Sequence, residues 1–209
     1  LEEVADLHEI PAGAYNIRAN GQMTARNTTA NINIVSKEGK SGIDIRIKPG
    51  TKKESVHIPV ILSKSGFKEV VYNDFYIGND CDVVIVAGCG IHNSGALDSQ
   101  HDGIHRFFVG RNAKVKYVEK HYGTGEGYGK RILNPVTEVY QEEGSYVDGV
   151  LWRISERDER HLDHYEGFPY LYGKEPVVVI DQDGIRHEIM AYTMNSPYKD
   201  TPAMPSKAY

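Results

Sequence analysis

The segments "GNDCDV" (78–83), "GRNAKV" (110–115) and "EEGSYV" (142–147) share one pattern. Each is a polar turn followed by a small residue, a polar or aromatic residue and a valine. The valines stand at positions 83, 115 and 147, which is a period of 32 residues repeated twice. In a strand-rich sequence such a period is typical of the stacked rungs of a β-helix. An antiparallel sandwich with evenly spaced turns would give the same pattern, so the repeat alone leaves both architectures open.

The residues around the repeat alternate between apolar and polar with a period of two. "IDIRIKPG" (43–50) places Ile43, Ile45 and Ile47 on one face and charged side chains on the other. Similar segments follow as far as residue 123, each bounded by Gly, Asn or Asp. This alternation predicts short β-strands joined by tight turns. We therefore expect residues 1–147 to form a mostly β unit.

The pattern changes after Val147, where the sequence predicts a helix. "SERDERHLDHYEG" (155–167) begins with Ser155, a good N-cap, and Asp158 has the spacing of a capping box. Gly167 suits the left-handed position that ends many helices.

Strands are predicted on both sides of this helix. "DGVLWRIS" (148–155) precedes it, and "EPVVVID" (175–181) and "HEIMAYTM" (187–194) follow, joined by the turn signal "QDG". Residues 148–209 are therefore expected to form a small α+β (βαββ) C-terminal unit.

Composition excludes several classes of protein. The 209-residue chain is 40% apolar and 25% charged, as in globular proteins, and its net charge of −5 argues against nucleic acid or an anionic membrane as partner. The longest apolar run, "VVIVA" (83–87), is too short to span a bilayer. The acidic N-terminal segment does not match a signal peptide, and two cysteines do not make a disulfide framework. We expect a cytoplasmic protein.

Residues 1–146 resemble the SufB/SufD family of iron–sulfur cluster assembly scaffolds. The resemblance rests on "IPAGAYNIRANG" (10–21), "VYNDFYIGNDCDVVIVAGCGIHNSG" (71–95) and "DSQHDGIHRFFVGRNAKVKYVEKHYGTGEG" (98–127). It implies a right-handed β-helix and a non-enzymatic scaffold role in a SUF-type system. It also implies a SufC-like ABC ATPase and a SufB/SufD-type partner or a self-dimer. The later rungs and the ATPase-gripping helical segment of that family have no counterpart after Val147.

The stretch "AGCGIHNSGALDSQHDGIH" (87–105) gathers candidate metal ligands. Cys89 and His92 have C-x2-H spacing, and His101 and His105 have H-x3-H spacing. Thiolate and imidazole are suitable ligands for iron, zinc or an iron–sulfur cluster, and His121 would join them if rungs stack. The alternative is that these are polar turn residues, with Cys89 a small buried apolar residue.

The tail resembles the second half of γ-glutamylcyclotransferase-like proteins, including the AIG2-like group. In that family, the α-amine of a γ-glutamyl compound attacks its own γ-carbonyl and 5-oxoproline leaves. The resemblance places the general acid/base on Glu166 of "LDHYEG" (162–167). The alternative is a solvated carboxylate at a helix end.

The first half of that family supplies a "YGS" or "YGT" loop that binds substrate. "YGTG" (122–125) has the right letters, but it lies only 44 residues before Glu166 and is accounted for by the scaffold resemblance. From the sequence alone we therefore predict a scaffold, with a cyclotransferase as the alternative. Whether the two parts form a natural fusion, a chimera or an artefact stays open at this point.

Overall fold

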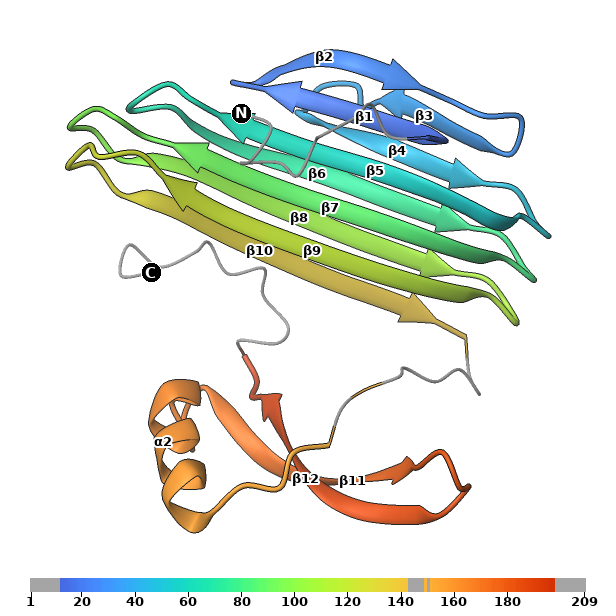
Figure 1. Ribbon diagram of the computed structural model, residues 1–209. Coiled ribbons are helices and arrows are strands. Elements are labelled where there is room, and N and C mark those ends of the chain that lie inside the picture. Colours follow the sequence, from blue (N-terminus) through green and yellow to red (C-terminus); the bar gives the residue numbers. More distant parts are fainter. Residues whose placement is uncertain (1–11, 143–148, 150, 198–209) are drawn as a thin grey trace. The chain divides into compact units, whose positions relative to one another are not determined.

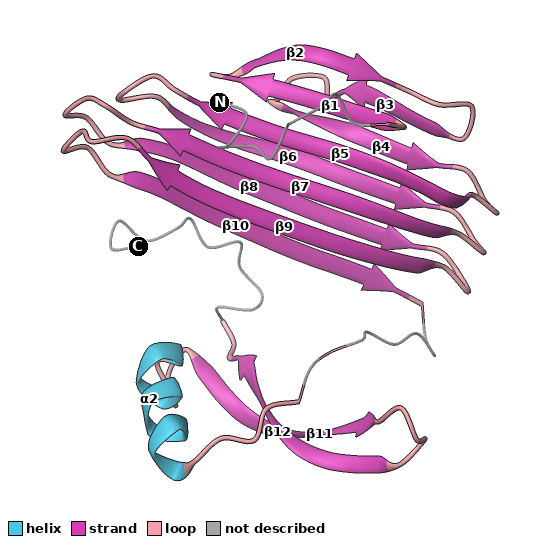
Figure 2. Ribbon diagram, in the orientation of Figure 1, coloured by secondary structure: helices cyan, strands magenta, loops and turns pink. Residues whose placement is uncertain are grey.

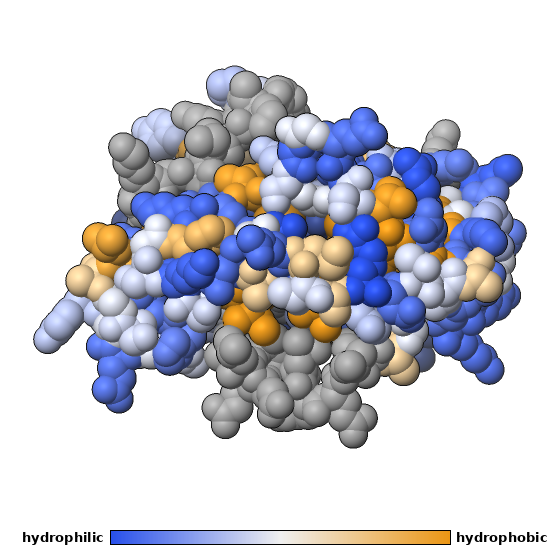
Figure 3. Space-filling model, turned by 90° about the horizontal axis from the view of Figure 1, so that it is seen from above, coloured by the Kyte–Doolittle hydropathy of each residue, from blue (hydrophilic) through white to orange (hydrophobic). Residues whose placement is uncertain are grey.

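The computed structural model describes residues 12–142, 149 and 151–197 (Figure 1). The chain divides into two compact units, Leu1–Tyr146 and Val147–Tyr209, which we describe one at a time. Among the described residues, no helix combines the length and the apolar character needed to cross a membrane. Apolar side chains on the face seen in Figure 3 are scattered among polar ones.

The described part of the first unit is built of strands β1 to β10. Their bounds are β1 (Ala14–Ala19), β2 (Gln22–Asn27), β3 (Ile32–Ser36), β4 (Gly42–Ile47), β5 (Lys52–Leu62), β6 (Lys68–Ile77), β7 (Asp82–His92), β8 (Ser99–Val109), β9 (Lys114–Thr124) and β10 (Arg131–Gln141). Sheet 1 has the order β2-β1-β5-β7-β9, and sheet 2 has the order β10-β8-β6-β4-β3.

From β5 onward, consecutive strands alternate between the two sheets, and neighbours within each sheet run parallel (Figures 1 and 2). The chain therefore winds as a solenoid, with one strand of each sheet in every rung. An antiparallel sandwich, the alternative left open by the repeat, is excluded because its neighbouring strands would run in opposite directions. The right hand of the winding stays a prediction.

The 32-residue period sets the register of the pairs β6–β8, β7–β9 and β8–β10, whereas the pairs β4–β6 and β5–β7 have shorter offsets, as in Val56 with Ile85. Val83 of β7 pairs with Val115 of β9, as the repeat predicts, while Val147 lies outside the described residues. On the outer face of sheet 2, Tyr76, Phe108 and Tyr140 stack with ring centroids 5.1 and 4.9 Å apart. These separations are close to the spacing of neighbouring strands, so equivalent residues of successive rungs lie above one another.

The core lies between the two sheets. Alternate residues of each strand point inward, and Ile32, Ile45, Val56, Phe75 and Ile85 are fully buried. The rings of Phe75 and Phe107 stack with centroids 4.3 Å apart. The side chains of one rung therefore pack on those of the next.

The second unit contains helix α2 (Glu156–Glu166) and the antiparallel hairpin of β11 (Tyr172–Ile180) and β12 (Arg186–Met194). The prediction of a strand over 148–155 was wrong, because the described residues 151–155 form no strand. A strand needs a neighbour for its backbone N–H and C=O groups, and the described part of this unit offers that segment no pairing.

Candidate functional site

Two places in the chain carry the predicted functional residues, and the first is the interior of the solenoid. His101, Gly103 and His105 alternate along β8, so all three face inward. Both histidines are buried. The spacing of four residues thus brings the two imidazoles together, as the sequence predicts.

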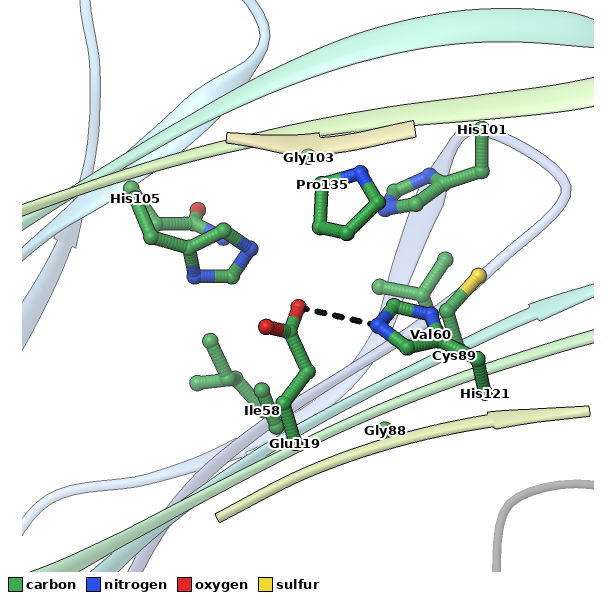
Figure 4. A pocket seen from close by; sticks show the side chains of 12 residues that line it. Ile58, Val60, Gly88, Cys89, His101, Gly103, His105, Glu119, His121 and Pro135 are labelled. Atoms are coloured by element: carbon green, nitrogen blue, oxygen red, sulfur yellow. Dashed lines mark ion pairs between the residues drawn. The ribbon is translucent and has the colours of Figure 1, made fainter. Parts of the chain in front are cut away.

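These residues line a small cavity of about 10 Å³ between the sheets (Figure 4). This is room for about one water-sized sphere. Its walls are formed by Ile58, Val60, Asn73, Ala87, Gly88, Cys89, His101, Gly103, His105, Glu119, His121 and Pro135.

Glu69 of β6 holds His101 in place. The two residues are register partners on neighbouring strands, and Nδ1 of His101 lies 2.9 Å from Oε1 of Glu69. Burial alone would raise the pKa of Glu69, but His101 and then Arg18, whose Nη2 lies 3.2 Å away, together lower that pKa below its ordinary value. A charged carboxylate therefore accepts the Nδ1–H of His101 and fixes the orientation of its ring.

His105 is positioned differently. Its Nδ1 lies 3.4 Å from the hydroxyl of Tyr117 on the opposite sheet. Burial, followed by the nearby His101 and His121, lowers the pKa of His105 to about 4. The imidazole is therefore neutral at physiological pH, which is the form that binds metals.

Gly103 leaves open the space between these two rings. A Cβ at Gly103 would lie 2.8 Å from Nε2 of His105 and 3.3 Å from Nε2 of His101. A side chain at this position would therefore press on the His105 ring, and glycine lets both rings lie beside the backbone of β8.

The opposite sheet contributes Cys89 from β7 and Glu119 and His121 from β9. Oε1 of Glu119 lies 3.3 Å from Nε2 of His121, and both side chains are partly exposed. Burial, followed by Glu69 and Glu119, raises the pKa of the Cys89 thiol. The polar pair thus lines the cavity and keeps partial access to solvent, while the thiol is enclosed.

His92, the fourth candidate ligand, does not share the cavity. It is the exposed last residue of β7, and its Nδ1 lies 3.2 Å from Oγ1 of Thr124. Residues three apart in a strand point to opposite faces, so the C-x2-H spacing separates Cys89 from His92. The other cysteine, Cys81, donates to the carbonyl of Lys48 in another part of the core.

Glu69, Glu119 and Asn73 were not among the predicted site residues. Glu69 stands 32 residues before His101 and Asn73 stands 32 before His105, so the repeat period contained the signal for both. Glu119 is inward-facing two residues before His121. Because every second residue of a strand points to the same side, applying that alternation to β9 from His121 would have identified Glu119.

The described residues hold no group of three or more His, Cys, Asp or Glu side chains already arranged as a metal site. An iron–sulfur cluster is usually held by several thiolates. Since the two cysteines of this chain belong to separate core clusters, they do not fit a cluster within one chain. The iron–sulfur cluster thus stays a prediction.

The second place is the end of helix α2. Ser155 caps the helix and forms the expected capping box with Asp158, and Gly167 ends it with a left-handed φ of 64°. Glu166 is the last helical residue and is half-buried. Among the described residues, no hydrogen bond or ion pair engages its carboxylate. The carboxylate is therefore available to a ligand.

The other carboxylates of α2 fix the helix to the hairpin. Lys174 of β11 places Nζ 2.6 Å from Asp163 and 2.7 Å from Glu159. The hydroxyl of Tyr192 donates to Asp163, and Nζ of Lys174 lies 4.8 Å from the centre of the Phe168 ring. In "LDHYEG", Asp163 thus anchors the helix and Glu166 does not.

Comparison with known proteins gives one match. A family model described as gamma-glutamyl cyclotransferase, AIG2-like, matches residues 95–209, which is more than half of the chain. The match begins within the solenoid unit, further upstream than the resemblance of the tail alone, and it takes in "YGTG" at the end of β9. No curated protein and no solved structure matches the chain.

Proposed function

Because the chain belongs to the gamma-glutamyl cyclotransferase, AIG2-like family, we propose that it releases 5-oxoproline from γ-glutamyl compounds with Glu166 as the general acid/base. The single observation that carries this proposal is the free, half-buried carboxylate at the end of α2, within the family's "LDHYEG" motif. The family match, which reaches back to residue 95, favours this function over the scaffold role expected from the sequence.

The end of α2 suits a positively charged substrate group. The carboxyl end of a helix carries partial negative charge, and Glu166 adds a full negative charge at the same place. Together they would attract the α-ammonium of a γ-glutamyl compound. Asp163 supports this role because its contacts with Lys174 and Tyr192 fix the orientation of the helix.

The reaction then needs two protons to move from the attacking nitrogen to the leaving nitrogen. Glu166 accepts the first from the α-ammonium, and the freed amine nitrogen attacks the γ-carbonyl carbon to close the five-membered ring. Glu166 passes this proton to the leaving nitrogen as the bond between that nitrogen and the carbon breaks. The second proton, lost by the ring nitrogen, passes by way of Glu166 to the departing amine, so that the products are 5-oxoproline and an ammonium, with no net change in protons on the enzyme.

The test is release of 5-oxoproline from γ-glutamyl-alanine, glutathione and a γ-glutamylamine, separated by chromatography. Glu166→Gln keeps the shape of the side chain but removes the base, so we expect kcat to fall by roughly 10²–10⁴-fold. Glu188→Gln, a matched change at an exposed position of β12, should leave the rate unchanged. Absence of turnover by the wild-type chain, or equal rates in both variants, would overturn the proposal.

A second candidate function, an assembly scaffold, is favoured by the solenoid itself. Stacked rungs are the architecture implied by the SufB/SufD resemblance, and we propose a SufC-like ABC ATPase and a SufB/SufD-type or second identical chain as its partners. Co-expression with such an ATPase, followed by affinity capture and size-exclusion chromatography, tests this. Failure to form a complex of defined stoichiometry would exclude the scaffold role.

A further inference from the structure

We infer that Lys174 of β11 is a positioning residue for the cyclotransferase reaction, because its ammonium neutralises two carboxylates that share a helix face with Glu166 and fixes the chain on both sides of that base. The inference rests on the function proposed above. It adds a residue that lies outside the motif "LDHYEG" (162–167). Lys174 acts through Glu166 and has no contact with the reacting atoms.

The first support is the face of α2 on which Glu166 lies. Glu159, Asp163 and Glu166 are all partly buried, whereas Glu156 and Asp158 of the first turn are exposed. The three partly buried carboxylates stand at helical positions i, i+4 and i+7, so they lie on one face with neighbouring Cβ atoms about 5–6 Å apart. Like charges at this spacing destabilise one another. This face therefore needs a cation.

Lys174 supplies that cation. Its Nζ lies 2.6 Å from Oδ1 of Asp163 and 2.7 Å from Oε1 of Glu159. Its hydrogen bonds with Asp163 and then with Glu159 raise the pKa of Lys174 above its ordinary value, so the ammonium is charged at physiological pH. Neither contact involves Glu166. The ammonium thus reduces the negative charge around the base without occupying the base itself.

The second support is that Lys174 contacts the chain before and after Glu166. Asp163 and Glu159 precede the base, and Phe168 follows it by two positions. Nζ of Lys174 lies 4.8 Å from the centre of the Phe168 ring, which is a cation–π distance. One ammonium therefore holds both the helix and the segment that leaves it, with Glu166 between them.

The third support is the way in which Lys174 is itself held. It pairs in register with Tyr192 of β12, whose ring centre lies 5.5 Å from Nζ and whose hydroxyl donates to Asp163. Both side chains therefore lie on the face of the hairpin that meets α2. Since no described residue of this unit is buried, these polar contacts set where the end of α2 lies.

The experiment measures kcat and KM for the release of 5-oxoproline from γ-glutamyl-alanine by the full chain. Lys174→Met removes the charge and should lower kcat by about 10–100-fold with little change in KM, because a displaced base affects the transition state more than substrate binding. Lys174→Gln keeps an N–H donor for Asp163 but lacks the charge, so it should also be slow. Lys174→Arg keeps the charge and should recover most of the rate.

A double variant separates the effect of charge from mere support of the fold. Adding Asp163→Asn to Lys174→Met removes a carboxylate that has lost its cation, while the amide oxygen can still accept from Tyr192. If Lys174 acts by neutralising its neighbours, the double variant should turn over faster than Lys174→Met alone. A double variant that is no faster would overturn the inference.

Arg186→Met, which removes a cation from an exposed position of β12, is the matched control and should keep the wild-type rate. If circular dichroism shows that Lys174→Met does not fold, the comparison of Lys174→Gln with Lys174→Arg decides. A raised KM with unchanged kcat would make Lys174 a substrate-binding group, and wild-type rates in Lys174→Gln would leave it no role. Either result overturns the inference while the proposed function stands, whereas absence of turnover by the wild type would overturn both.

Discussion

The two units of this chain are held together by different means. The solenoid buries whole rows of Ile, Val and Phe side chains between its sheets, whereas no described residue of the C-terminal unit is buried. Helix α2 instead relies on local interactions, namely its capping box and the contacts of Lys174 with Asp163 and Glu159. Non-local packing thus stabilises the first unit, and short-range polar contacts define the second.

This difference matters for where each activity is proposed. The buried cavity lies among side chains that are fixed by packing between neighbouring rungs, so its geometry is constant. Glu166 lies at the end of an element with few buried contacts, where local opening is easier. Measurements that compare equivalent changes in the two units will sharpen or break this contrast.

The largest expected change in the free energy of unfolding follows from the loss of a core aromatic ring. Phe75 is fully buried and stacks on Phe107, so Phe75→Ala should lower the free energy of unfolding by about 3–5 kcal/mol. Phe168→Ala, in the C-terminal unit, should cost about 1 kcal/mol or less because Phe168 is 38% exposed. Urea unfolding followed by circular dichroism measures both. Similar costs would show that the second unit has a core after all.

The next largest change in the free energy of unfolding is expected from removing a buried charge. Asp74 is only 3% exposed and binds Lys37 Nζ at 2.7 Å and Arg106 at 2.7 and 2.8 Å. Burial raises the pKa of Asp74, but Arg106 and Lys37 outweigh it and the net shift is downward. Asp74→Asn should therefore lower the free energy of unfolding at pH 7 by about 1.5–3 kcal/mol.

The pH dependence follows from that direction. The contribution of Asp74 is complete above the unfolded pKa of about 3.9 and is lost as pH falls through the lower folded value. The difference between wild type and Asp74→Asn should thus be constant near neutrality and shrink below about pH 4. Asp163→Asn is the matched control in the partly exposed cluster of the second unit and should have a smaller effect. A larger effect at Asp163 than at Asp74 would contradict the contrast.

The smallest effect is expected at the helix cap. Ser155→Ala removes the capping box of α2 and should cost about 1 kcal/mol. Hydrogen exchange of the α2 amides should accelerate about fivefold while the solenoid amides keep their rates. Ser94→Ala, at an exposed serine of the solenoid, is the control. Unchanged exchange in α2 would mean that packing rather than capping holds the helix.

The repeat in the sequence indicated a solenoid or an evenly spaced sandwich, and only the parallel pairing of the strands decided for the solenoid. Polar turns and valines at a constant spacing fix both the rung length and the register, which the Val83–Val115 pair confirms. The cap of α2 was equally predictable because it depends on four neighbouring residues. The strand expected at 148–155 failed because alternation shows which face is apolar, but it does not supply a neighbouring strand.

The site was predictable only where the spacing respects the geometry of a strand. His101 and His105 lie an even number of residues apart and do meet, whereas Cys89 and His92 lie an odd number apart and do not. The roles of Glu69 and Asn73 depend on contacts between strands 32 residues apart, so they emerged only with the register. The identity of Glu166 as a candidate base came from its motif, since a lone carboxylate at a helix end has no distinguishing pattern.

Because the later rungs share one register, the length of the solenoid can be changed by whole rungs. Excising residues 82–113 would remove β7 and β8 together. In sheet 1, β9 would then become the neighbour of β5, and in sheet 2, β10 would become the neighbour of β6, with inward and outward faces unchanged. Duplicating the same block would insert one more layer. A gene for such a chain can therefore be lengthened or shortened by recombination in steps of 32 codons, and each step alters the height of the stack but not the rule by which it is built.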